Sequence, residues 1–229
     1  QALPRAGGGA GAARLLADAL LTADIGVMLD SDLDSELSGA ACTVVQVEGL
    51  LGGSATPPTL ALAYAGDCRV VLGRCDDADA SGHGQWNAVS LSEDHRPGDP
   101  AEAARIVAAG GCVRKAPGPP SQGHLRVGPP RLWSRTADVL APGLALSRCL
   151  GDALGQSCGL SPEAAIHETA LSPSDKVIVV ASDGVFDVLT NMEVLRLCLP
   201  SLSSRDAAKA AAQIVAASSA AWATKGSYR

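Results

Sequence analysis

The sequence is poor in aromatic side chains: 3% of its 229 residues are Phe, Trp or Tyr, whereas 47% are hydrophobic. Its core must therefore consist mostly of Ala, Val, Leu and Ile. No apolar run approaches the ~18 residues that a membrane-spanning helix requires, so no membrane partner is expected. Basic residues are also in deficit, with a net charge of −6 and a sequence pI of about 5.1. This balance disfavours a nucleic acid or an anionic membrane as partner, because both bind clustered Lys and Arg.

The seven cysteines show no metal-binding pattern. Their number is odd and no two have C-x-x-C spacing, so a zinc site is not expected. We expect reduced thiols, which are typical of an intracellular protein of the cytoplasm or nucleus. No charged-then-apolar signal segment opens the chain, and residue 1 is Gln rather than Met. These features favour a piece of a longer protein.

Three common sequence patterns of functional sites are also missing. His83, His95, His124 and His167 are dispersed and form no H-x-x-x-H pattern, so structural or surface roles are expected for them. Ser38 has no G-x-S-x-G turn around it, which argues against a serine hydrolase. No G-x-G-x-x-G follows a predicted strand, so a dinucleotide-binding fold is not expected either.

Hydrophobic periodicity and turn residues predict helices and strands without strict alternation. The expected helices are 12–30, 99–109, 191–199 and 204–223, and the expected strands are 43–48, 60–65, 69–73, 86–91, 164–171 and 176–182. Residues 116–140, rich in Pro, Gly and Arg, are expected to be irregular and at the surface. Residues 1–11 resemble a flexible linker, and 12–229 form one partial domain of the α+β class.

Local patterns give finer expectations for the first predicted helix and for two strands. Leu15, Leu16, Leu20, Ala23 and Val27 recur at helical spacing, so they should lie on the apolar side of helix 12–30. A tight hairpin turn at residues 66–67 should join strands 60–65 and 69–73. Strand 176–182 is nearly continuously apolar, so it should be central and buried on both faces.

Polar residues predict how two of the helices begin and end. Asp99 should cap helix 99–109, with Glu102 completing a capping box, and Gly110 or Gly111 should end it. Ser204 should cap the last helix.

Carboxylates that follow apolar strands are the strongest candidates for chemistry. Asp183 directly follows strand 176–182, and Asp187 lies four residues further on. The two side chains converge if the chain turns helical there. Hard divalent cations such as Mg²⁺ prefer such oxygen ligands. The alternative is that Asp183 caps a helix beginning near Gly184 and Asp187 is solvated. Asp67 also follows an apolar strand, and it is either a ligand or an ordinary turn residue.

Arg148 and Asp152 lie four residues apart. They form either a buried ion pair, which we favour, or a contact with phosphate.

Six short segments carry motifs in a specific order. They are 38–42 (S-G-A-A-C), 65–69 (A-G-D-C-R), 91–97 (L-S-E-D-H-R-P), 102–111 (E-A-A-R-I-V-A-A-G-G), 144–152 (L-A-L-S-R-C-L-G-D) and 181–189 (A-S-D-G-V-F-D-V-L). This series resembles the type 2C (PPM) family of metal-dependent protein serine/threonine phosphatases. The segment P-P-R-L-W at 129–133 is similar to one found in a subgroup of this family in plants, algae and protists.

The resemblance implies an α-β-β-α sandwich, in which two antiparallel sheets are flanked by helices. It implies hydrolysis of phosphoserine and phosphothreonine in phosphoprotein substrates by a water that two Mg²⁺ or Mn²⁺ ions activate. Asp183 matches a ligand of that pair, and Asp67 and Asp187 match residues that hold a weaker, third ion. His95 matches a motif residue without a catalytic role, so no residue of this chain is assigned to acid–base catalysis. Residues 116–140 match a variable flap that helps select substrates.

The departures from the family pattern are at the two ends. The upstream D-G-H-G-G and acidic motifs and the downstream D-N-x-T motif, which carry the other metal ligands, are absent from this sequence. We therefore expect an incomplete domain that is inactive alone. The subgroup resemblance at 129–133 implies that regulatory domains can be fused outside this chain. Residues 38–41 read S-G-A-A where the family pattern is S-G-T-T, so two hydroxyl groups are missing. This difference leaves an alternative: a catalytically inactive binding or scaffold module.

Overall fold

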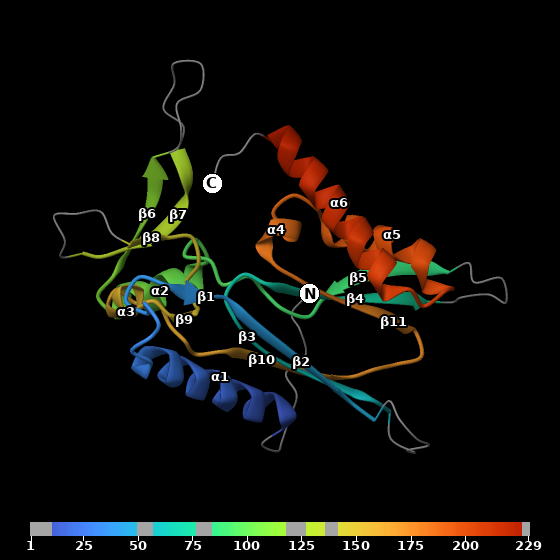
Figure 1. Cartoon of the computed structure of the whole chain (residues 1–229), viewed down its shortest axis with the longest axis horizontal. Coiled ribbons are helices and arrows are strands. Elements are labelled where there is room, and N and C mark those ends of the chain that lie inside the picture. Colours follow the sequence, from blue (N-terminus) through green and yellow to red (C-terminus); the bar gives the residue numbers. More distant parts are fainter. Residues whose placement is uncertain (1–10, 50–56, 77–83, 118–126, 136–141, 226–229) are drawn as a thin grey trace. The chain divides into compact units, whose positions relative to one another are not determined.

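The computed structural model describes residues 11–49, 57–76, 84–117, 127–135 and 142–225 (Figure 1). The expected linker therefore lies outside the described residues except for Gly11. The chain divides into two compact units. The first unit comprises residues 1–48, 60–67 and 94–169, and the second comprises residues 49–59, 68–93 and 170–229.

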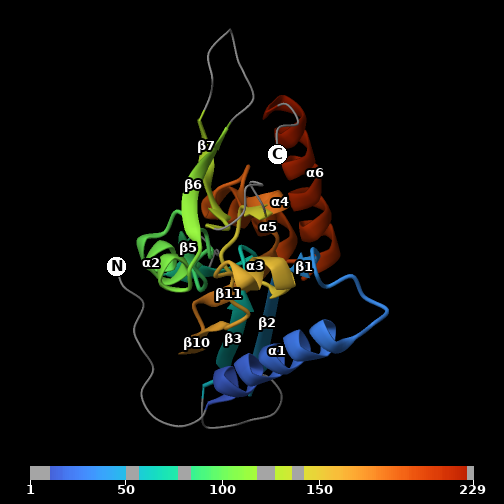
Figure 2. The ribbon, with the colours of Figure 1, turned by 90° about the vertical axis from the view of Figure 1, so that its left-hand side faces the viewer.

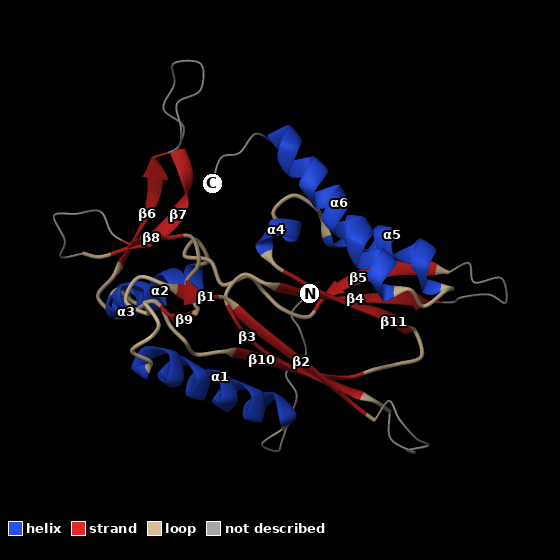
Figure 3. Ribbon diagram, in the orientation of Figure 1, coloured by secondary structure: helices blue, strands red, loops and turns tan. Residues whose placement is uncertain are grey.

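Helices and strands mix in both units (Figure 3). The first unit contains α1 (Ala12–Leu29), β1 (Gly39–Ala40), β2 (Cys42–Glu48), β3 (Thr59–Ala65), α2 (Pro100–Ala108), β6 (Cys112–Pro117), β7 (Val127–Trp133), β8 (Pro142–Leu144), β9 (Leu150–Gly151), α3 (Ala153–Ser157) and β10 (Ala165–Ala170). The second contains β4 (Arg69–Asp76), β5 (Gln85–Ser90), β11 (Asp175–Ala181), α4 (Asp183–Phe186), α5 (Asn191–Leu202) and α6 (Ala207–Lys225). Within the described ranges, no helix has the length and apolar character to cross a bilayer.

The expected α+β class is confirmed. The first unit holds a sheet of order β10-β3-β2, a smaller antiparallel sheet of order β6-β7-β8 and the antiparallel pair β1-β9. The second unit holds one antiparallel sheet of order β11-β4-β5. All the expected strands and helices exist, with ends shifted by a few residues.

Helix α1 packs on the β10-β3-β2 sheet of the first unit, as both Figure 1 and Figure 2 show. Leu20 is buried there among β3 and β2 residues. The predicted apolar side was wrong in part, because Leu15 is 66% exposed while the charged Asp24 is 5% exposed. The Asp24 carboxylate accepts hydrogen bonds from the Gly151 backbone N–H at 2.8 Å and the Gln156 amide at 3.0 Å. Burial of a carboxylate is tolerable when such donors replace water, and hydrophobic periodicity cannot reveal them.

Strand β4, rather than β11, is the buried centre of the second unit's sheet. β11 pairs with β4 only and lies at the edge of the sheet that the described strands form, and Val180 on β11 is 49% exposed. The predicted central position of residues 176–182 was therefore wrong. An apolar run marks a strand well, but its neighbours are decided by chain segments far away in sequence.

Two predicted turns and caps were also wrong. β3 and β4 belong to different sheets, so residues 66–67 carry the chain between sheets and do not form a hairpin. Helix α6 begins at Ala207, and the Asp206 side chain accepts from the Lys209 N–H, so Ser204 is not its cap. A full capping box occurs instead at α5, where Thr190 and Glu193 bond reciprocally.

Residues 127–133, within the stretch predicted to be irregular, form strand β7, which pairs antiparallel with β6. Residues 118–126 and 136–140 of that stretch lie outside the described residues. Pro129 and Pro130 lie within β7. Pro lacks an N–H and is tolerated where a strand has only one hydrogen-bonded neighbour. The pairing of β7 with β8 begins only at Leu132, so both prolines lie where β8 does not reach.

Helix α2 begins and ends at strong local signals. The Asp99 carboxylate accepts from the N–H groups of Ala101 and Glu102, as predicted for a cap. The Glu102 side chain does not complete a capping box, because it pairs with Arg105 instead. Gly110 ends the helix at φ +94°, and the Gly111 N–H donates to the Ile106 carbonyl at 3.0 Å, as in a Schellman motif.

We expect Gly111→Ala to destabilise the protein more than Gly110→Ala. A Cβ at Gly111 would overlap the backbone carbonyl of Cys158, whereas a Cβ at Gly110 would meet no atom within 4 Å. The Gly110 variant should lose about 1–2 kcal/mol through its positive φ alone. The Gly111 variant should lose about 3 kcal/mol or more, because backbone must move. Chemical denaturation of both variants tests this order, and equal losses would contradict it.

Candidate metal-binding turn

Asp183 and Asp187 share the single helical turn that follows β11. Asp183 is the first residue of α4, and the Asp187 N–H donates to the Asp183 carbonyl at 2.8 Å. The residue at the cap position is Ser182, so Asp183 does not cap a helix beginning at Gly184. Both aspartates are partly buried. The strand thus delivers Asp183 to a fixed position at its carboxyl end, as predicted.

Helix α6 holds this turn in place through two hydrogen bonds. The Trp222 indole N–H donates to the Gly184 carbonyl at 2.7 Å. The Lys225 ammonium donates to the Asp187 carbonyl at 2.7 Å. Phe186, 7% exposed, anchors the turn in the apolar core of the second unit. A turn fixed on both sides suits a binding role, because its carboxylates need little ordering.

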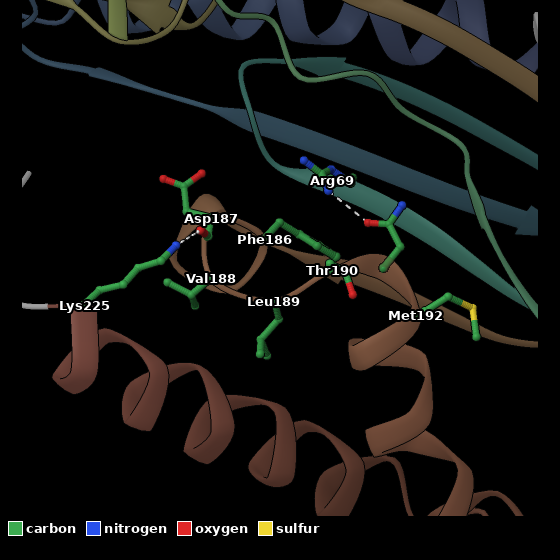
Figure 4. A pocket seen from close by; sticks show the side chains of 9 residues that line it. Arg69, Phe186, Asp187, Val188, Leu189, Thr190, Met192 and Lys225 are labelled. Atoms are coloured by element: carbon green, nitrogen blue, oxygen red, sulfur yellow. Dashed lines mark hydrogen bonds between the residues drawn. The ribbon is translucent and has the colours of Figure 1, made fainter. Parts of the chain in front are cut away.

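A shallow hollow of about 680 Å³ lies beside this turn (Figure 4). Its lining comes from β4, the segment after α4, the start of α5 and the end of α6. The Arg69 guanidinium lies 4.8 Å from the centre of the Phe186 ring and donates to the Asn191 side chain at 2.9 Å. Figure 4 shows the Asp187 carboxylate directed away from α6. The lining of the hollow therefore combines cationic groups with an acidic one.

Asp67 lies in the first unit, directly after β3, and is 5% exposed. Its carboxylate is 3.6 Å from the Arg96 guanidinium. Gly66, the residue before it, has φ +123°. The Gly66 backbone N–H donates to the ring Nδ1 of His95 at 3.2 Å, and the backbone N–H of His95 donates to the Gly66 carbonyl at 3.0 Å. Asp67 is thus a buried, ion-paired residue on a pinned turn. Asp183 and Asp187 belong to the other unit.

His95 supports this turn as a neutral ring. It stacks on Tyr64 with a distance of 4.9 Å between ring centroids. Burial, together with the positive charge of Arg148, lowers the pKa of His95 to about 4. A neutral imidazole whose Nδ1 accepts a backbone N–H fits a structural role at physiological pH. The expectation that His95 has no catalytic role is consistent with this geometry.

A complete centre for two metal ions is not formed by the described residues. Within those ranges no three His, Cys, Asp or Glu side chains converge on a point. Mg²⁺ requires octahedral oxygen coordination, and one or two carboxylates of a single turn leave most positions to water. The described residues therefore do not by themselves fit a two-metal centre.

Arg148 pairs with Glu102, not with Asp152 as predicted. The Arg148 guanidinium approaches the Glu102 carboxylate at 2.6 Å, and Arg105 and Ser147 donate to the same carboxylate at 2.8 and 2.6 Å. Asp152 instead accepts from the Gly155 N–H at 2.7 Å. This buried cluster was missed, since its partners lie 45 and 46 residues apart; the i, i+3 spacing of Glu102 and Arg105 was the one local signal.

The sequence model of the family described as Protein phosphatase 2C matches residues 9–226. The chain belongs to the protein phosphatase 2C family. It is 33% identical over 196 residues to Probable protein phosphatase 2C 12 of Oryza sativa subsp. japonica, and the matched region covers 85% of this chain and 44% of that protein. It is 32% identical over 189 residues to Probable protein phosphatase 2C 61 of Arabidopsis thaliana, with 80% and 54% covered. The chain thus spans about half the length, or less, of these protein phosphatase 2C relatives.

Solved structures confirm the protein phosphatase 2C fold. The serine-threonine phosphatase 2C of Toxoplasma gondii superposes with a TM-score of 0.65 at 22% identity, over 90% of this chain and 62% of that one. A C. elegans sex determining protein also superposes with a TM-score of 0.65, at 20% identity, over 92% of this chain and 44% of that one. At these identities the likeness establishes the fold.

Proposed function

We propose that this chain is part of a protein serine/threonine phosphatase that hydrolyses phosphoserine and phosphothreonine in proteins with Mg²⁺ or Mn²⁺ as cofactor. The observation that carries the proposal is the position of Asp183, at the end of β11 on a turn anchored by Trp222, in a chain that matches the phosphatase family over residues 9–226. Bound divalent ions would supply a polarised water and neutralise phosphoryl charge. The scaffold alternative is not favoured by the comparisons.

The roles proposed for the three aspartates are those that the family resemblance implies. We assign Asp183 as a ligand of the main metal pair, with the remaining ligands contributed from outside the described residues. Asp187 and Asp67 are each proposed as a ligand of a more weakly bound ion. Asp67 is paired with Arg96 at 3.6 Å, so a cation there must compete with an existing positive charge, which lowers affinity.

We expect the 229-residue chain alone to show little or no phosphatase activity. A single anchored carboxylate holds Mg²⁺ or Mn²⁺ weakly, since the ion keeps most of its water. The measurement is Mn²⁺-dependent release of phosphate from a phosphopeptide, by this chain and by the protein of the complete reading frame. Robust turnover by the chain alone would contradict the assignment of ligands. Inactivity of a complete protein that carries the D-G-H-G-G and D-N-x-T motifs would contradict the proposed function itself.

A further inference from the structure

Positive charge is concentrated in one stretch of this acidic chain. Residues 103–137 contain no Asp or Glu, although the net charge of the whole sequence is −6. The basic residues of this stretch are Arg105, Arg114, Lys115, Arg126, Arg131 and Arg135. Arg105 is used in the Glu102 cluster. Most of the others fall on or beside the β6–β7 hairpin, which rises from α2 in Figures 1 and 2.

The strand register places two arginines on one face of the hairpin. Arg114 of β6 is directly opposite Arg131 of β7, whereas Val113 is opposite Leu132. Leu132 is fully buried, so the Val113–Leu132 face packs on the core. Side chains alternate between faces along a strand, so Arg114 and Arg131 project from the opposite face, with their Cβ atoms about 5 Å apart. Like charges directly opposite each other destabilise a strand pair.

Two hydrogen bonds to backbone carbonyls tie the side chains of this face to the neighbouring strands. The Arg131 guanidinium donates to the Gly143 carbonyl at 2.7 Å, and the Trp133 indole N–H donates to the Arg114 carbonyl at 3.1 Å. Trp133 is on the arginine face, since it lies two residues from Arg131. The ion pairs found in the described parts of the chain involve other arginines. Neither guanidinium therefore has an ion-pair partner among the described residues, and both lie on the same face of the strands as Trp133.

We propose that this basic hairpin face, made of Arg114, Arg131 and Trp133, binds acidic segments of the phosphoprotein substrate, rich in Asp, Glu or additional phosphate. That the bound segment belongs to a substrate rests on the proposed phosphatase function, whereas the binding of an acidic segment does not depend on it. Guanidinium forks bind carboxylates and phosphates in bidentate fashion. Two arginines suit a short acidic peptide, whereas a nucleic acid needs a longer basic stripe and would be repelled by the remaining negative charge.

Fluorescence anisotropy with labelled peptides tests the proposal on the 229-residue chain. One peptide carries Glu and Asp around a phosphoserine, and its partner has Gln and Asn at the same positions. The acidic peptide should bind about five-fold more tightly at low salt, and the difference should shrink at high salt. Arg114→Gln/Arg131→Gln should remove the preference. Arg14→Gln/Arg196→Gln, which removes the same charge from exposed arginines elsewhere, should leave it intact.

The outcomes separate the alternatives. Equal binding of both peptides, or equal losses in the two double variants, would overturn the proposal, because net charge rather than this face would then govern binding. Tighter binding of an oligonucleotide or of anionic vesicles than of the acidic peptide would overturn it too. Arg114→Glu/Arg131→Glu, which changes the pair from two positive to two negative charges, should reverse the preference towards a Lys-rich peptide, and the absence of a reversal would contradict direct contact. Catalytic inactivity of the complete protein would defeat the proposed function while leaving these binding results unchanged.

Discussion

Asp183→Asn should reduce the phosphatase activity of the complete protein by about 100-fold or more. Asparagine keeps the size of the side chain and its place on the anchored turn but removes the negative charge that a hard divalent cation requires. Loss of metal-site partners beyond the direct ligands already costs about 10- to 100-fold, so loss of a ligand should cost at least as much. Steady-state hydrolysis of a phosphopeptide over a range of Mn²⁺ concentrations measures the effect.

Two comparisons make this result specific. Asp187→Asn should lose much less activity, since Asp187 is assigned to a weaker ion. Asp206→Asn is the matched control, because Asp206 is exposed and caps α6, and asparagine caps a helix equally well. Calorimetric titration with Mn²⁺ supplies a readout independent of turnover. Unchanged Mn²⁺ affinity in the Asp183 variant would show that this carboxylate is not a ligand.

Glu102→Gln should destabilise the protein by about 3 kcal/mol, because removing one partner of a buried ion pair leaves the other charge uncompensated. Glu102 is 6% exposed, and its carboxylate receives hydrogen bonds from Arg105, Arg148 and Ser147. The substitution leaves two guanidinium groups without their counter-charge. Urea denaturation measures the loss, with Glu36→Gln at an exposed position as the control. A loss as small as that of the control would contradict a stabilising role for the cluster.

Wild type and Glu102→Gln should differ in how their stability depends on acidic pH. Burial alone would raise the pKa of Glu102, but the hydrogen bonds from Arg148, Arg105 and Ser147 outweigh burial and lower the pKa from 4.5 to about 2. A depressed pKa in the folded state contributes stability that is fully present above about pH 4.5 and is lost as the pH falls towards 2. The difference in unfolding free energy between wild type and Glu102→Gln should therefore narrow across this range. A constant difference would contradict the assignment.

The ordered motifs of the sequence were enough to predict the family, the fold class and the strand that carries Asp183. They succeeded because each motif is local: an apolar strand, a Gly and an Asp at fixed spacing identify a strand end without knowledge of its neighbours. The N-cap at Asp99 and the helix end at Gly110 were predictable for the same reason, since capping involves residues only a few positions apart.

The predictions of ion pairing and of sheet order failed because they concerned partners distant in sequence, whereas the failed caps at Ser204 and Glu102 were local. Arg148 had a plausible partner four residues away in Asp152, yet the fold gives it Glu102, 46 residues upstream. The apolar run of β11 predicted a central strand, yet β4 occupies the centre of the described sheet. The two prolines of β7 predicted irregularity, yet the shortness of β8 leaves them a permitted place.

By itself, the sequence determined which segments form strands and helices, that Asp99 caps α2, and which carboxylates follow strands, because dihedral preferences and side-chain periodicity act over a few residues. Only the tertiary structure decided which charges meet. It buried Glu102 between Arg105 and Arg148, fixed the Asp183 turn against Trp222, and set Arg114 opposite Arg131. Such pairings depend on strand register and on loop closure over tens of residues, and no short window of sequence encodes either.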